Sequence, residues 1–70
     1  MPPSEVYTTF QGIDRKGVSA IGSVTDEVGP FVDARFRAGW RSLQVERAGE
    51  QVGGITVRDG RRVWWAENAR

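Results

Sequence analysis

Apolar and polar residues alternate along the last third of the chain with the two-residue period of β-strands. Three strand candidates lie between about residues 40 and 66, and two short turn sequences, Ala48-Gly49 and Asp59-Gly60, separate them. An Asp-Gly pair between alternating apolar residues is a strong signal for a two-residue type I′ hairpin turn. The pattern therefore predicts a three-stranded antiparallel meander over about residues 40–66.

The two turns also predict which residues face one another across the meander. The expected pairs are Val45 with Val52, Leu43 with Gly54, Arg41 with Thr56, Val63 with Thr56, Trp64 with Ile55, and Trp65 with Gly54. Because successive side chains of a strand point to opposite faces, these pairs predict a buried face on which Trp65 covers the bare backbone of Gly54. That face comprises Leu43, Val45, Val52, Val63 and Trp65.

The first half of the chain predicts a β segment and one helix. Residues 6–10 and 18–24 are strand candidates, and the turn signal of residues 14–17 joins them into a hairpin. A short helix is expected near residues 30–38, starting at Pro30 and ending at Gly39, with Asp33 and Arg37 as an i,i+4 ion pair. We therefore expect one α+β domain over residues 1–70, with residues 1–5 as a disordered tail and residues 68–70 as a fraying end.

The amino-acid composition excludes several kinds of catalytic and metal site but indicates no particular function. The 70 residues include no histidine and no cysteine, which excludes Ser-His and Cys-His nucleophilic systems and thiolate metal sites. The glycines lack the strand-turn-helix context of a phosphate-binding loop. We expect a protein that is not an enzyme and that uses no cofactor, no metal and no small-molecule substrate.

Charge and hydropathy bear on partners and location. The formal net charge is +1, and no apolar run approaches the roughly 18 residues that a membrane span needs. We expect no membrane association and a soluble protein in the cytoplasm of a bacterium or an infected host cell. The charge is far from the strongly basic balance typical of domains that bind nucleic acid mainly through phosphates.

Two surfaces are candidates for binding. Tryptophan and arginine are enriched at protein interfaces, and the predicted face opposite the core carries a set of partner-binding candidates for another protein or a second copy of the chain: Trp40, Ile55, Arg62 and Trp64. The alternative is a nucleic-acid contact by the arginines of the hairpin tip, namely Arg58, Arg61 and Arg62. A minor structural component of a virion or a larger assembly is a third hypothesis.

The segments around Arg35–Leu43, Val52–Ile55 and Gly60–Glu67 resemble short uncharacterised proteins of GC-rich actinobacteria and their phages. The resemblance covers about half the chain. It implies an accessory protein of phage type, a regulator or inhibitor that binds a host or viral macromolecule, and it assigns no site residue.

Overall fold

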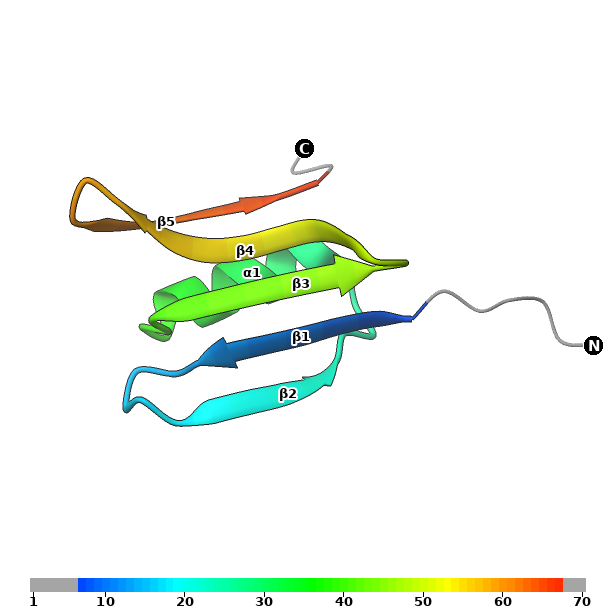
Figure 1. The fold of residues 1–70 in the computed structure, drawn as a ribbon, viewed down its shortest axis with the longest axis horizontal. Helices are drawn as coiled ribbons and strands as arrows, with labels where there is room; N and C mark the ends of the chain where they lie inside the picture. The colour runs from blue at the N-terminus through cyan, green and yellow to red at the C-terminus, as the bar shows by residue number, and fades with distance from the viewer. Residues whose placement is uncertain (1–6, 68–70) are drawn as a thin grey trace, which may run out of the picture.

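The computed structural model describes residues 7–67, which form one five-stranded antiparallel sheet and one helix. The spatial order of the strands is β2-β1-β3-β4-β5 (Figure 1). This arrangement confirms the α+β class, and pairing of β1 with β3 joins the N-terminal hairpin to the C-terminal meander as a single sheet. The expected tails at residues 1–5 and 68–70 lie outside the described residues. The elements are β1 (Thr8–Ile13), β2 (Ser19–Ser23), α1 (Val28–Arg37), β3 (Ser42–Arg47), β4 (Glu50–Arg58) and β5 (Arg61–Ala66).

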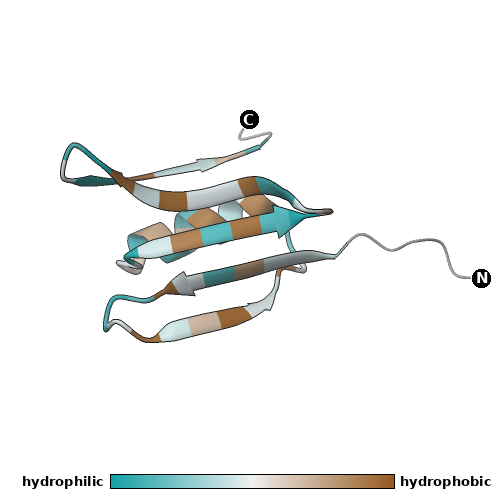
Figure 2. Ribbon diagram, viewed as in Figure 1, coloured by the Kyte–Doolittle hydropathy of each residue, from teal (hydrophilic) through white to brown (hydrophobic). Residues whose placement is uncertain are grey.

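Helix α1 covers one face of the sheet and contacts mainly β4 and β5. In Figure 1 it lies behind the ribbons of β3 and β4. Brown and teal bands alternate along β3 in Figure 2, as expected for a strand that buries one of its faces. Gly53 lets the helix approach, because a Cβ atom there would lie 2.8 Å from Cγ1 of Val28 and 3.2 Å from Cγ2 of Val32. The buried core comprises Val24, Val28, Val32, Leu43, Val45, Val52 and Ile55.

The helix begins two residues before the expected start and ends as expected. Pro30 is its third residue, still within the first turn, where a missing backbone N–H needs no partner. At the other end Gly39 has a φ of +89°, and the bonds Gly39 N–H to Phe36 O and Trp40 N–H to Arg35 O form a Schellman motif. The Asp33–Arg37 ion pair is confirmed at 3.0 Å.

Both predicted hairpin turns are present. Ala48 and Gly49 have φ values of +54° and +80°, and Asp59 and Gly60 have +54° and +77°, as type I′ turns require. The predicted register between β4 and β5 is confirmed, with Trp64 opposite Ile55 and Trp65 opposite Gly54.

The predicted register between β3 and β4 is wrong beyond the first two pairs. Next to the turn, Glu46 lies opposite Gln51, as a two-residue turn requires. A β-bulge between Val45 and Glu46 then leaves Val52 as an extra residue, so that Val45 pairs with Gly53 and Leu43 with Ile55. A shift of one residue exchanges the two faces of a strand. The bulge therefore places Leu43 on the same face as Trp64 rather than Trp65.

Candidate docking face

The two adjacent tryptophans point to opposite faces, but in the reverse sense to the prediction. Trp64 is partly buried and packs against the core beneath α1. Trp65 is 43% exposed and lies on the face that α1 does not cover, which we call the open face. Trp65 does lie over the bare backbone of Gly54, as predicted, since its Nε1 is 3.4 Å from the place that a Gly54 Cβ would take.

The structure places most of the predicted partner-binding set on the face that α1 covers, rather than on an uncovered face. Ile55 is a core residue with 3% exposure, and Trp40 is partly buried, with its ring centroid 6.1 Å from that of Phe10. Trp64 shares their face. The sequence signal that could have shown this is the Gly53-Gly54 pair, because glycine inside a strand pattern often marks a bulge or a close backbone approach.

Arg62, the fourth member of that set, holds the end of the helix against β5. Its Nη1 donates to the carbonyl oxygens of Phe36 at 2.9 Å and Trp40 at 3.0 Å. Its guanidinium lies 4.2 Å from the centre of the Phe36 ring. These contacts stabilise the carbonyl end of α1, where a cation is also favoured by the helix dipole. Arg62 thus has a structural role and is already engaged.

The three arginines predicted to contact nucleic acid do not share one face of the sheet. Arg58 and Arg61 lie opposite one another beside the β4–β5 turn, and both are exposed. Strand alternation places them on the open face, whereas Arg62 belongs to the helix face. Arg41 is exposed at the same end of the sheet, with its guanidinium next to Gly17 of the β1–β2 turn.

A row of residues crosses the open face from one edge strand to the other. The row begins with Ile21 on β2 and ends with Trp65 on β5; between them, the Gln11 amide donates to Oε1 of Gln44 at 3.1 Å. None of these side chains is charged. The full row is Ile21, Gln11, Gln44, Gly54 and Trp65.

Two hollows are lined in part by residues of this row. A shallow one of about 410 Å³ runs along β3 and β4, with Gly54 among its lining residues and Trp65 at its side. Gly54 cannot carry a side chain there, because a Cβ would lie 2.6 Å from the carbonyl oxygen of Leu43. A second hollow of about 280 Å³ is lined by Ile13 and Ile21 at the β1–β2 side.

The two ends of the sheet carry opposite charge. The end that holds the β1–β2 and β4–β5 turns is rich in exposed cations, and the end that holds the β3–β4 turn and the link from β2 to α1 is rich in exposed carboxylates. Although the net charge is nearly zero, each end of the sheet can attract a partner of the opposite charge. The exposed cations are Arg15, Lys16, Arg41, Arg58 and Arg61, and the exposed carboxylates are Asp26, Glu27, Glu46 and Glu50.

Asp14 organises the turn at the basic end. Its Oδ1 accepts the backbone N–H groups of Val18 at 2.9 Å and Lys16 at 2.8 Å. These hydrogen bonds, that from Val18 above all, lower the pKa of the Asp14 carboxyl below its ordinary value against an opposing effect of desolvation. The Asp14 carboxylate is thus committed to the turn.

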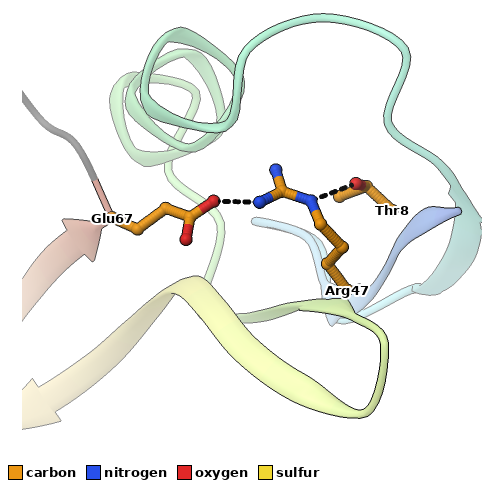
Figure 3. A network of polar contacts seen from close by, with 3 residues as sticks. All are labelled: Thr8, Arg47 and Glu67. Carbon is orange, nitrogen blue, oxygen red and sulfur yellow. Dashed lines mark hydrogen bonds and ion pairs between the residues drawn. The ribbon is translucent and has the colours of Figure 1, made fainter. Parts of the chain in front are cut away.

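Arg47 ties three segments together near the acidic end (Figure 3). Its Nε donates to Oγ1 of Thr8 at 3.1 Å, and its Nη1 forms an ion pair with Oε2 of Glu67. Both charged side chains are more than a third exposed, so the pair contributes at most about 1 kcal/mol. Arg47 is therefore engaged on the helix face, and among the strands of residues 7–67 no other cation lies at this end of the sheet.

Among residues 7–67, no three His, Cys, Asp or Glu side chains cluster in a way that could hold a metal ion. Within the same residues, no helix has the length and apolar character needed to cross a membrane. The chain matches no protein-family model, no curated protein and no solved structure.

Proposed function

We propose that this chain is a non-enzymatic protein-binding module that docks its partner on the open face around Trp65. The observation that carries the proposal is Trp65 itself, an indole 43% exposed beside a hollow of about 410 Å³ on an uncovered sheet face. Interfaces favour large aromatic side chains at their centres and charged groups at their rims. The open face carries an uncharged row that ends in Trp65 on β5, and the exposed Arg41, Arg58 and Arg61 lie beyond this row at one end of the sheet.

The same distribution defines the chemistry of the partner. A protein segment that inserts an apolar side chain beside Trp65 would gain contact area over the bare backbone of Gly54. Carboxylates of that segment would pair with the arginines at the basic end, where attraction speeds association and sets the orientation. We infer a partner with an apolar anchor flanked by acidic residues, and the role of a phage-type regulator or inhibitor suggested by the sequence is compatible with such a surface.

Site-specific photocrosslinking tests this proposal. Benzoylphenylalanine replaces Thr56 on the open face or, as a matched control, the exposed Arg37 on α1, and each chain is irradiated in a bacterial lysate. We expect a discrete protein adduct from position 56, none from position 37, and loss of the adduct when Trp65→Ala is added. Equal adducts from both positions, no adduct from position 56, or an adduct insensitive to Trp65→Ala would contradict the proposal.

A second candidate is nucleic-acid binding at the basic end. Arg58 directly opposite Arg61 is an unfavourable pair of like charges, and such a pair is relieved by a bound phosphate. Binding to a DNA duplex would weaken steeply with salt, would be lost in the double variant Arg58→Ala with Arg61→Ala, and would be kept in Trp65→Ala, which removes docking on the open face. A titration of labelled duplex DNA at two salt concentrations separates the two functions.

A further inference from the structure

Strand β2 is an edge strand without the usual protection against pairing. It is the lower edge of the sheet in Figure 1, and its sequence, Ser19–Ser23, contains no charged residue and no proline. The opposite edge, β5, carries Arg61 and Arg62. Soluble proteins commonly protect edge strands by charge, proline or bulges, because free backbone groups there pair with other strands. Ile21, at the centre of β2, is 79% exposed.

The hydrogen bonds that flank β2 fix which of its backbone groups point outward. Asp14 N–H bonds to Val18 O, and Val24 N–H bonds to Thr8 O, so residues 18 and 24 both direct their backbone groups toward β1. In an antiparallel sheet, the backbone groups of alternate residues of a strand form hydrogen bonds with the neighbouring strands on opposite sides. The backbone N–H and C=O groups of residues 20 and 22 therefore also point toward β1. Those of Ser19, Ile21 and Ser23 point to the free edge.

The sequence around Ile21 is complementary to itself when read in the opposite direction. Small residues stand at equal distances on both sides of Ile21, followed by two valines and then by charges of opposite sign. An antiparallel pairing centred on Ile21 would bring the basic residues of one copy beside the acidic residues of the other. The matching positions are Ala20 with Gly22, Ser19 with Ser23, Val18 with Val24, Lys16 with Asp26, and Arg15 with Glu27.

We propose that β2 pairs with β2 of a second copy of this chain about a two-fold axis at Ile21, which joins two sheets into one. The outward groups of Ser19, Ile21 and Ser23 are those that this register needs, and together they form about six interchain hydrogen bonds. Ile21 of each copy contacts Ile21 of the partner subunit on the open face. Helix α1 contacts mainly β4 and β5, and in Figure 1 it lies behind β3 and β4, away from the β2 edge.

The flanking charges give this pairing its direction. Lys16 in the turn before β2 faces Asp26 of the partner subunit, and the two-fold axis repeats this contact at the other end of the pair. A parallel pairing would instead set like charges side by side, which is unfavourable. In this dimer Trp65 lies on β5, at the edge of each sheet opposite the β2–β2 contact. The dimer proposal is therefore independent of the docking function proposed above.

Analytical ultracentrifugation over a range of concentrations tests the dimer. The wild-type chain should show a monomer–dimer equilibrium, and Ile21→Lys should raise the dissociation constant at least about tenfold, because two ammonium groups then meet at the axis. The matched control is Val57→Lys, which changes a valine that is 59% exposed on β4, away from β2, and should leave the constant within about a factor of two. A monomer at all concentrations, or a dimer that tolerates Ile21→Lys, would overturn the proposal.

Two further measurements test the register. Lys16→Asp should raise the dissociation constant about two- to fivefold, and adding Asp26→Lys should restore it, since both ends of the pair regain opposite charges. In hydrogen exchange, the Ile21 amide should become protected only at concentrations where the dimer forms, while the Gly22 amide, which faces β1, should be protected throughout. Failure of the double variant to recover, or an Ile21 amide that exchanges alike in monomer and dimer, would exclude this register.

Discussion

Replacing Arg62 by alanine should destabilise the fold far more than replacing its neighbour Arg61. Arg62 makes two hydrogen bonds to carbonyl oxygens at the end of α1 and stacks on Phe36, whereas Arg61 is exposed beside the turn. Hydrogen bonds to a charged group contribute about 1.5–3 kcal/mol each, and a cation–π contact about 0.5–1 kcal/mol. Partial exposure reduces the sum, so we expect a loss of about 2–3 kcal/mol for Arg62→Ala and less than about 0.5 kcal/mol for Arg61→Ala.

Urea denaturation followed by far-UV circular dichroism measures the difference. In a domain of this size, 1 kcal/mol corresponds to a shift of about 4–8 °C in Tm, so a thermal melt should separate the two variants clearly. Arg62→Lys should fall between them, because an ammonium group keeps the charge but not the planar fork of donors. Equal losses from Arg61→Ala and Arg62→Ala would refute the structural role of Arg62 and return it to the candidates for binding.

Three other substitutions test separate parts of the fold. Gly53→Ala should cost about 1–3 kcal/mol in urea denaturation, because its Cβ would lie 2.8 Å from Val28 in a packed core; an unchanged midpoint would mean that the helix is not held so close. Ala48→Asn should stabilise by about 0.5–1 kcal/mol in the same assay, since asparagine accepts a φ of +54° at less cost than alanine, and a loss of stability would contradict the type I′ turn. For Asp14, whose pKa is lowered in the folded state, the stabilising effect is full above the ordinary carboxyl pKa of about 3.9 and disappears as the pH falls through the folded-state value. In thermal melts between pH 2 and 6, the Tm of the wild type should therefore exceed that of Asp14→Asn near pH 6, and the two Tm values should converge near pH 2. A difference in Tm that stays constant with pH would exclude this linkage.

Local sequence signals predicted the parts of the fold that local chemistry determines. Asp59-Gly60 and Ala48-Gly49 specify type I′ turns because few other residues accept positive φ values, and Gly39 ends the helix for the same reason. The register of β4 with β5 follows directly from its turn. These turn and cap residues, together with the alternation of apolar residues, were sufficient to predict the α+β class.

The candidate face could not be predicted in the same way because one bulge controls it. Val52 resembles any other strand residue, and its insertion depends on how Gly53 meets α1 and how the Gly54 backbone approaches Leu43. Those contacts are tertiary, and they reverse the faces of β3 relative to β5 and to the part of β4 that follows Val52. The role of Arg62 was hidden for a similar reason, since its partners are carbonyl groups 22 and 26 residues away along the chain.

The central claim is that this bulge turns Trp65 outward and Trp64 inward, and hydroxyl-radical footprinting of the native chain tests it most directly. Tandem mass spectrometry assigns the oxidation rate to each tryptophan separately, without any substitution. The structure predicts that Trp65 is oxidised faster than Trp64. Equal rates, or faster oxidation of Trp64, would contradict the register of the sheet and remove the proposed docking face.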